Sequence, residues 1–261
     1  MSPVQVKHGD SPLILGQPHG GSFVPDEIWA WFNDNGRKLA DTDWHIGRLY
    51  EGISPSATVV SATFHRYVID ANRDPSGASL YPGQNTTGLC PLIDFDGAAI
   101  YQRGHEPTPK AIDARRANFH ARYHKALATE IERVKALHGF AIVYDCHSIR
   151  SHIPFLFEGT LPDLNIGTDN GKTCSPKIQD AVVEIAKASD YTSVLNGRFR
   201  GGWTTRHYGQ PSSGVHAIQM EVAQSAYLET EVLPWAYSEA KASRLRPILK
   251  NILTALEGFR P

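Results

Sequence analysis

Residues 108–148 read TPKAIDARRANFHARYHKALATEIERVKALHGFAIVYDCHS, and they predict a helix, a buried strand and a polar cluster in succession. Thr108-Pro109 is typical of a helix start, because the threonine hydroxyl accepts from a free amide and proline needs no donor. Apolar residues then recur every three or four positions until Gly139, namely at Phe119, Tyr123, Leu127, Ile131 and Val134. The apolar run at 140–144 predicts a strand that ends at Asp145-Cys146-His147-Ser148.

The same alternation of strands and helices continues on both sides of this stretch. Short apolar or β-branched runs predict strands at residues 13–15, 58–63, 67–69 and 217–222. Further helices are expected from Ser175-Pro176 and from about Pro247, the latter ended by Gly258. The pattern predicts an α/β fold with a mixed, mostly parallel central sheet flanked by helices. Such sheets bind ligands beyond the carboxyl ends of their strands.

The chain of 261 residues shows no internal repeat and no linker-like change of composition, so we expect a single domain over residues 1–261. Residues 74–109 are rich in glycine and proline and predict a long ordered loop. Its apolar residues are expected to be buried: Tyr81, Leu89, Leu92, Ile93, Phe95, Ile100 and Tyr101.

The charge balance argues against nucleic acid or a membrane as a partner, because 27 acidic and 26 basic residues leave a net charge of -1. No apolar run approaches the roughly 18–20 residues of a membrane helix, and residues 1–12 lack an apolar signal-peptide core. We therefore expect a soluble, cytoplasmic protein. Three scattered cysteines are too few for a disulfide framework or a Cys-rich zinc site, so any metal must be bound by histidines and carboxylates.

Two histidines follow predicted strands and are therefore candidate metal ligands. His19 follows the first predicted strand, and His147 lies in the polar cluster that follows the run at 140–144. Asp145, in the same cluster, is placed to orient the His147 ring. Two imidazoles and a carboxylate around an open position form a common catalytic zinc site. We predict Asp43 as the carboxylate, with Asp41 as the alternative, although either could instead cap the amphipathic stretch that follows.

Residues 65–74, HRYVIDANRD, predict recognition of an anionic small molecule. The guanidinium groups of Arg66 and Arg73 can bind a carboxylate through two parallel hydrogen bonds, and Asn72 adds an uncharged hydrogen-bond donor. Glu221 lies in an apolar strand, where burial raises the pKa of a carboxyl group toward the range of a general base. Arg198, Arg200, Arg206, His207 and Tyr208 surround Gly201-Gly202 in a basic loop that either closes on a second carboxylate or is solvated.

In their order, the motifs PHGG, DTDWH, HRYVIDANRD, DCHS and QMEV resemble the N-formylglutamate amidohydrolase family, which is akin to zinc carboxypeptidases and aspartoacylases. The resemblance runs from His19 past Glu221 and includes RGGWTTRHYGQP at 200–211. It implies a zinc-carboxypeptidase-like fold and one Zn²⁺ per chain. The related pattern has a glutamate ligand three residues after the first histidine, whereas Ser22 stands there in this chain, which is why Asp43 is considered.

The resemblance also implies the reaction and the role of each residue. Zinc-activated water would deformylate N-formyl-L-glutamate to L-glutamate and formate, a step of histidine degradation. The roles that the resemblance implies are metal binding by His19 and His147, general base catalysis by Glu221, oxyanion stabilisation by Arg66, and α-carboxylate binding by Asn72 and Arg73. Arg206, with Arg200 as the alternative, would meet the side-chain carboxylate beside Tyr208.

Four other functions remain open at this point. The substrate could be another N-acyl amino acid, or the protein could bind acidic metabolites without catalysis. Asp145 and His147 also suggest a dinuclear manganese ureohydrolase, although Ile149 stands where such an enzyme needs an acid. Cys146 beside His147 suggests thiol catalysis, although adjacent strand residues point to opposite faces. The expected partner is a small-molecule substrate, and the oligomeric state is left open.

Overall fold

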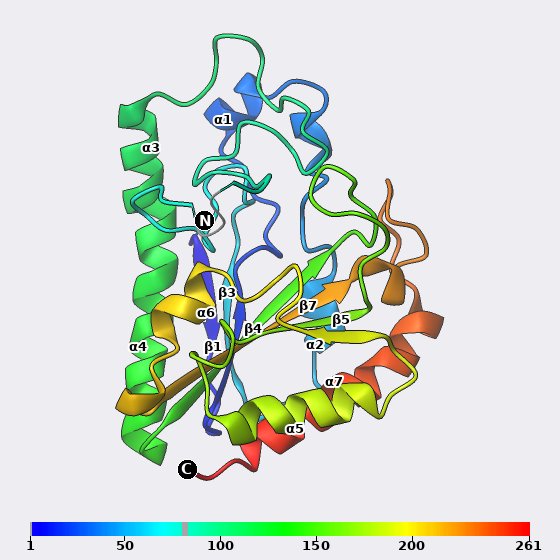
Figure 1. Cartoon of the computed structure of the whole chain (residues 1–261). Helices are drawn as coiled ribbons and strands as arrows, with labels where there is room; N and C mark the ends of the chain where they lie inside the picture. The colour runs from blue at the N-terminus through cyan, green and yellow to red at the C-terminus, as the bar shows by residue number, and fades with distance from the viewer. Residues whose placement is uncertain (1, 80–82) are drawn as a thin grey trace.

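A mixed β-sheet forms the centre of the computed structural model, which describes residues 2–79 and 83–261. In these residues seven strands are ordered β1-β3-β2-β4-β7-β5-β6 (Figure 1). The strands are β1 (Val4–Lys7), β2 (Leu13–Gln17), β3 (Thr58–Ala62), β4 (Ala141–Ile149), β5 (Leu164–Gly167), β6 (Ser193–Leu195) and β7 (Val215–Ala223). The central strands β3, β2, β4 and β7 are parallel, whereas β1 and β5 pair antiparallel to their inner neighbours. The expected mixed, mostly parallel sheet is confirmed.

Helices cover both faces of the sheet. They are α1 (Asp26–Trp31), α2 (Ile46–Tyr50), α3 (Pro109–Arg115), α4 (Ala121–His138), α5 (Pro176–Lys187), α6 (Trp203–Tyr208) and α7 (Glu239–Glu257). A π-helical turn, η2 (Arg116–His120), joins α3 to α4, and short 3₁₀ turns are η1 (Gly36–Lys38), η3 (Pro211–Ser213) and η4 (Gln224–Ala226). None of the described helices is long and apolar enough to span a bilayer.

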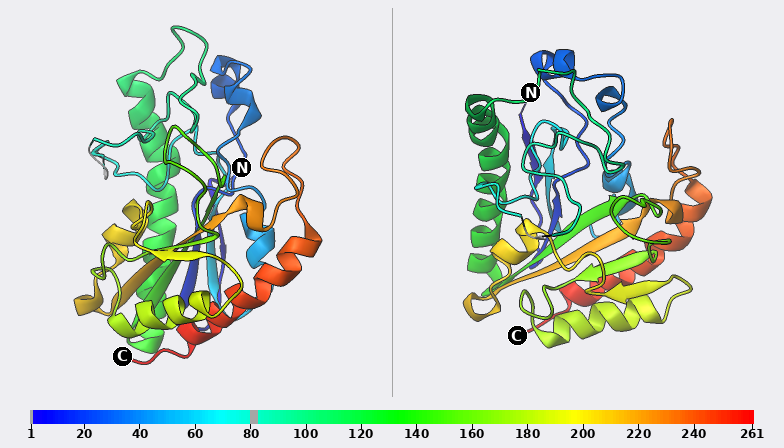
Figure 2. Two further views of the ribbon diagram at one scale, coloured as in Figure 1. Left: turned by 45° about the vertical axis from the view of Figure 1, so that its right-hand side comes forward. Right: turned by 45° about the horizontal axis from the view of Figure 1, so that its top comes forward.

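The apolar stripe of α4 packs on one face of the sheet, where Tyr123 and Leu127 join a buried cluster with Ile14 and Val143. Helices α2, α5 and α7 cover the opposite face, as both views in Figure 2 show. As a result, β4 and β7 are buried along their whole length, and the first four residues of β4 are apolar or aromatic. The layers leave the carboxyl ends of the central strands open for a site.

Local sequence signals place several helix ends as expected. The Thr108 hydroxyl accepts from the Ala111 amide, and Ser175 caps α5 in the same way through Ile178. Gly139 ends α4 with a φ of 80°, a conformation that glycine adopts without strain.

Two expected elements differ from the structure. Residues 67–69 form a turn after β3 rather than a strand, since the Val68 amide donates to the His65 carbonyl oxygen. Their side chains are buried, which is why the run resembles a strand. Helix α7 begins at Glu239, well before Pro247, because Ser238 caps it and Pro247 is tolerated on its exposed side.

The segment before α3 is a long ordered loop, as predicted. In its described residues, Ile93 and Ala99 form an isolated bridge, and Phe95 and Ile100 are buried. Leu92 is exposed, contrary to expectation, and Tyr81 lies outside the described residues. The sequence pattern does not predict the outer strands β1, β5 and β6, because all three are short. Strands β1 and β6 are only partly buried, and β5 is buried by residues distant in the sequence.

Candidate active site

Polar side chains meet where the parallel strands β2, β4 and β7 end. His19 comes two residues after β2, whereas His147 and Glu221 lie opposite each other in the β4–β7 register. The segment before α2 brings in Asp43, whose amide donates to the His19 carbonyl oxygen. All four side chains are at most 7% exposed. The fold therefore gathers residues that are far apart in sequence at one buried edge of the sheet.

His19, Asp43 and His147 form a group that could hold a metal ion. One ligand atom from each lies within 4.8 Å of the others. Asp43 Oδ2 is 3.9 Å from His19 Nδ1 and 3.3 Å from His147 Nδ1. His19 Nδ1 is buried and has no hydrogen-bond partner among the described residues. A buried acceptor of this kind, beside a second imidazole and a carboxylate, fits a divalent cation.

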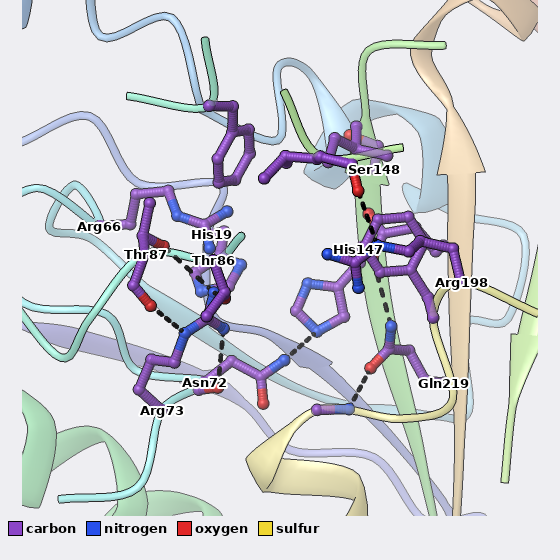
Figure 3. Close-up of a pocket in the computed structure, with 16 residues that line it drawn as sticks. His19, Arg66, Asn72, Arg73, Thr86, Thr87, His147, Ser148, Arg198 and Gln219 are labelled. Carbon is purple, nitrogen blue, oxygen red and sulfur yellow. Dashed lines mark hydrogen bonds between the residues drawn. The ribbon is translucent and has the colours of Figure 1, made fainter. Parts of the chain in front are cut away.

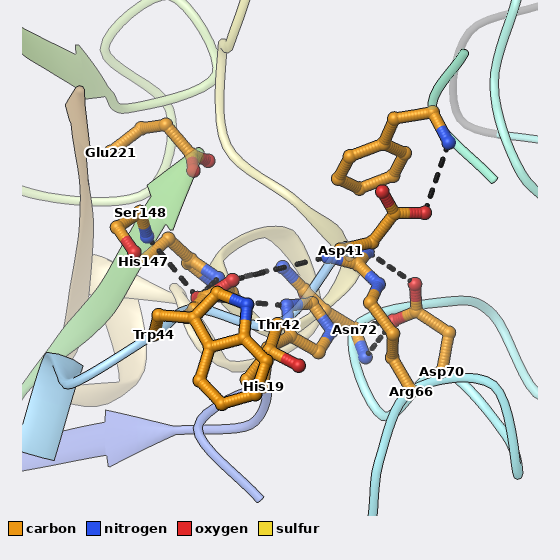
Figure 4. A network of polar contacts seen from close by, with 12 residues as sticks. His19, Asp41, Thr42, Trp44, Arg66, Asp70, Asn72, His147, Ser148 and Glu221 are labelled. Atoms are coloured by element: carbon orange, nitrogen blue, oxygen red, sulfur yellow. Dashed lines mark hydrogen bonds and ion pairs between the residues drawn. The ribbon is translucent and has the colours of Figure 1, made fainter. Parts of the chain in front are cut away.

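Each of the two imidazoles has a carboxylate on its other ring nitrogen. His19 Nε2 donates to Asp70 Oδ1 at 2.7 Å, and His147 Nε2 lies 3.2 Å from Asp145 Oδ1. The Asp70 carboxylate holds the proton of His19 on Nε2 and leaves its Nδ1 as the metal-binding atom, whereas His147 Nε2 also lies 3.0 Å from Asn72 Nδ2. Figure 4 shows His19 between the Asp70 carboxylate and the His147 ring. Asp145 thus lies where the strand pattern predicts it.

Buried charges tune the pKa values of this group. Burial lowers the pKa of His19, and the Arg66 guanidinium lowers it further. Burial would raise the pKa of Asp70, but Arg66, Arg73 and His19 hold it well below its usual range. Burial would lower the pKa of His147, but Asp145 and Asp43 raise it well above its usual range. Positive charge between Asp43 and Asp145, either a proton or a cation, is therefore stabilised.

Glu221 is held next to the histidine pair by a neighbour on its own strand. Gln219 Nε2 donates to Glu221 Oε2 at 3.2 Å, while Gln219 Oε1 accepts from the Gly202 amide at 2.6 Å. Burial raises the pKa of Glu221 to about 8, against the opposing charge of His147. A carboxyl group with this pKa can both take and release a proton near neutral pH.

Arg66, Asn72 and Arg73 line a cavity in front of these residues (Figure 3). Arg66 donates to Asp70 at 2.6 Å and stacks over Phe95, with 4.7 Å from its guanidinium carbon to the ring centre. Arg73 donates through Nε to the Thr87 carbonyl oxygen at 3.0 Å. These contacts fix two guanidinium groups on the same side of the cavity, where an anionic group can be bound.

The structure does not place every expected residue at the cavity. Neither Arg206 nor Tyr208 is among the described residues that line it. Arg206 Nε donates to the Gly201 carbonyl oxygen, and Nη1 lies 3.6 Å from Asp169. Tyr208 contacts His124 instead. Arg200, the alternative, is exposed and donates to Gly197.

Arg198 of the basic loop lines the cavity, whereas the resemblance implied Arg206 or Arg200 for the side-chain carboxylate. Its Nε donates to the Leu156 carbonyl oxygen and its Nη2 to that of Asn85. In Figure 3 Arg198 lies on the opposite side of the cavity from Arg66 and Arg73. The abundance of arginine in residues 198–206 was a signal for such a residue, but it could not show which one faces the site.

Asp41 and Cys146, which entered two of the earlier alternatives, have other surroundings. Asp41 Oδ2 accepts from the Tyr67 hydroxyl at 2.8 Å and from the Phe95 amide at 2.9 Å, apart from the group around Asp43. Burial raises the pKa of Asp41 to about 7. Cys146 is packed in the apolar core, and burial raises the pKa of its thiol well above the usual range. Neither environment favours metal binding by Asp41 or attack by a Cys146 thiolate.

Comparison with known proteins gives a consistent assignment. Residues 11–228 match the family model for N-formylglutamate amidohydrolase. The chain is 41% identical over 252 residues to the N-formylglutamate deformylase of Pseudomonas aeruginosa, covering 96% of this chain and 94% of that protein. It is 42% identical over 250 residues to the N-formylglutamate deformylase of Pseudomonas putida, covering 95% and 93%.

A similar fold occurs in the crystal structure of N-formylglutamate amidohydrolase from Ralstonia eutropha JMP134. The TM-score is 0.80 at 24% sequence identity, and the superposition covers 98% of both chains. At this level of identity the likeness concerns the arrangement of strands and helices.

Proposed function

Because the chain belongs to the N-formylglutamate amidohydrolase family, we propose that it hydrolyses N-formyl-L-glutamate to L-glutamate and formate. The observation that carries this proposal is the buried His19–Asp43–His147 group beside Glu221, in a cavity that three arginines line. A metal-ligand set next to a carboxyl base suits amide hydrolysis, and guanidinium groups suit a substrate with two carboxylates. The expected cytoplasmic location, the single domain and the role in histidine degradation are parts of the same proposal.

We assign the metal site to His19, Asp43 and His147, with zinc as the metal. The donor set of two nitrogens and one carboxylate oxygen is the common one for catalytic zinc. When bound there, zinc supplies Lewis acidity at the formyl oxygen and lowers the pKa of water toward about 7. Asp70 orients the His19 ring through Nε2, while Asn72 and Asp145 lie beside Nε2 of His147.

Glu221 is the proposed general base and acid. Its carboxylate takes the proton of the attacking water and then gives a proton to the nitrogen that leaves with glutamate. Its place opposite His147 and its raised pKa support this role. Gln219 positions the carboxylate through its amide nitrogen. Arg66, on the other side of the His19 ring, is proposed to stabilise the negative charge that develops on the formyl oxygen.

Asn72 and Arg73 are the proposed partners of the α-carboxylate. Arg73 offers a guanidinium group, and Asn72 offers an uncharged amide donor next to His147. For the side-chain carboxylate we propose Arg198 in place of the expected Arg206. Its position across the cavity from Arg73 suits a dicarboxylate whose two charged ends point apart.

The test is an assay of purified, metal-quantified protein with N-formylglutamate, N-formylaspartate and N-acetylaspartate. We expect release of formate from N-formylglutamate in preference to the other substrates. Glu221→Gln should keep the bound metal and lose at least about a hundredfold in kcat, a typical loss when a general base is removed. Wild-type turnover by this variant would refute the role of Glu221. Binding of N-formylglutamate without turnover by the metal-loaded wild type would indicate a binding protein for acidic metabolites instead.

A further inference from the structure

We propose that His120 and His124 are positioning residues, which hold the backbone of residues 71–73 so that Asn72 and Arg73 face the cavity. The inference rests on the proposed function, since it assigns these histidines a role through the substrate contacts of Asn72 and Arg73. Neither histidine lines the cavity within the described part of the chain, and both are contributed by the long helical segment around α4.

The two histidines bind carbonyl groups on either side of Asn72. His124 Nε2 donates to the Ala71 carbonyl oxygen at 2.7 Å, and His120 Nε2 donates to that of Arg73 at 3.0 Å. The donors are one helical turn apart, and their rings lie 4.4 Å apart between centres. His120 ends the π-helical turn η2, and π turns inside helices occur frequently at functional sites.

His124 also contacts Tyr208. With the proton on Nε2, Nδ1 of a neutral His124 ring is an acceptor, and the Tyr208 hydroxyl lies 3.1 Å from it and 3.2 Å from the His124 carbonyl oxygen. Burial lowers the pKa of His124 to about 3 and also lowers that of His120. Neutral rings, which can donate through Nε2 as described above, are therefore favoured near neutral pH.

Helix α6 holds Asn72 from the opposite side. The Thr204 amide donates to Asn72 Oδ1 at 2.8 Å, which turns Nδ2 toward His147. Gly202 lies so close that an added Cβ atom would be 2.2 Å from Asn72 Nδ2, so only glycine fits. The Trp203 ring packs edge-on against His124, with 4.6 Å between centres. Asn72 is thus enclosed by α4 and α6.

This enclosure predicts that substrate affinity is the first property to suffer when it is loosened. The hydrogen bonds of His120 and His124 go to the backbone of Ala71 and Arg73, which flank the proposed α-carboxylate partners. The same segment also contacts the groups around the metal ligands, because the Asn72 amide donates to Asp70 Oδ1 at 2.8 Å and Asn72 Nδ2 lies 3.0 Å from His147 Nε2. A displaced 71–73 segment would therefore move Asn72 and Arg73 directly, and would reach His19 and His147 only through these contacts.

The decisive experiment compares His124→Leu with His124→Gln in the metal-loaded enzyme. Leucine lacks the donor for the Ala71 carbonyl group, so KM for N-formylglutamate should rise about tenfold, by a larger factor than kcat falls. Glutamine can restore the donor and should recover most of the affinity. His216→Leu is the matched control, because His216 is a buried ring on β7 whose Nδ1 accepts from the Ser175 amide away from the cavity. That control should lose stability without a change in KM.

A double-mutant cycle with Arg73→Lys tests whether the effect passes through the 71–73 segment. If it does, the combined loss in kcat/KM should be clearly smaller than the product of the single losses. The reason is that a displaced Arg73 already binds the substrate weakly, so replacing it costs little more affinity. Multiplicative losses, or a fall in kcat larger than the rise in KM in His124→Leu, would overturn the proposal. Tyr208→Phe, which removes one hydroxyl group, replaces His124→Leu in the cycle if the leucine variant does not fold, and the same outcomes then decide.

Calorimetric binding of L-glutamate, the product, separates this inference from the proposed function. A wild type that neither hydrolyses N-formylglutamate nor binds L-glutamate would refute the function and the positioning role together. A wild type that does both, beside a His124→Leu variant with unchanged KM and unchanged affinity for L-glutamate, would refute the positioning role alone. We expect about tenfold weaker binding of L-glutamate by His124→Leu, and wild-type binding by His216→Leu.

Discussion

At the scale of single residues, Asp43 and Asp41 show how two similar carboxylates acquire different roles. Asp43 Oδ2 faces the Nδ1 atoms of His19 and His147, whereas Asp41 Oδ2 accepts from Tyr67 and from the Phe95 amide. The first environment attracts a cation. In the second, two donors of the protein satisfy Oδ2, while Oδ1 has no hydrogen-bond partner among the described residues, and an asparagine oxygen can accept from the same two donors.

We therefore predict that Asp43→Asn loses most of its bound metal, while Asp41→Asn keeps the wild-type amount. An amide is a much weaker ligand than a carboxylate and cannot balance the charge of the cation. The measurement is metal content by elemental analysis after dialysis. Equal metal content in the two variants, or loss in Asp41→Asn alone, would make Asp41 the ligand.

Arg198 and Arg206 are the second pair of similar residues with different surroundings. Arg198→Ala should lower kcat/KM for N-formylglutamate by about tenfold to a hundredfold, because a charge-assisted contact to the side-chain carboxylate is lost. For N-formylglutamine, which lacks that charge, the loss should be much smaller. Arg206→Ala serves as the matched control and should discriminate little between the two substrates. The opposite pattern in the two variants would assign the carboxylate to Arg206.

At the scale of elements, the helical segment from Pro109 to His138 carries two functions on two faces. Its apolar stripe packs on the sheet, while His120 and His124 reach the 71–73 segment from the π-helical turn and the start of α4. Burial of neutral histidines in this way links stability to pH.

The contribution of His124 to the free energy of unfolding should fall as the pH drops below about 6.5. The unfolded chain protonates His124 with its ordinary pKa, whereas the native protein does so only near pH 3, so the unfolded state binds more protons between these values. The limiting slope for one such group is about 1.4 kcal/mol per pH unit. Urea unfolding at pH 7.5 and pH 5.0 should show that, when the pH is lowered, the wild type loses more free energy of unfolding, or gains less, than His124→Gln. An equal difference in both proteins would contradict this linkage.

At the scale of the whole molecule, the candidate metal site joins two neighbouring strands of the sheet to the segment before α2. His19 follows β2, His147 lies in β4, and Asp43 precedes α2 on the other side of the sheet edge. A cation bound by all three would tie these segments together only in the folded state.

Removal of the metal should therefore lower Tm. A ligand present at a thousandfold excess over its Kd stabilises the native state by about 4 kcal/mol, and a chelator cancels this contribution. Thermal unfolding with and without EDTA measures the effect, and re-addition of zinc should reverse it. Asp43→Asn should show no response to EDTA. A wild-type Tm that is indifferent to EDTA, in protein shown to contain metal beforehand, would contradict the expected coupling.

Sequence alone determined the features that depend on near neighbours. Helix ends depend on residues a few positions away, as the caps at Thr108 and Ser175 and the end of α4 at Gly139 show. The apolar runs of β2, β4 and β7 likewise predict strands, with His19, His147 and Glu221 at or near their carboxyl ends. The ordered motifs pointed to the family that the comparisons confirm. The strand predicted at 67–69 is wrong, because a buried turn and a buried strand both consist of apolar residues in the sequence.

Only the tertiary structure decided which side chains of the loops face the cavity. Arg198 is directed by the carbonyl groups of Leu156 and Asn85, and Arg206 by Gly201 and Asp169. Likewise, Asp43 meets the two imidazoles because the segment before α2 docks on the sheet edge. A loop has no repeating backbone geometry that links residue number to side-chain direction, so contacts with distant residues set that direction.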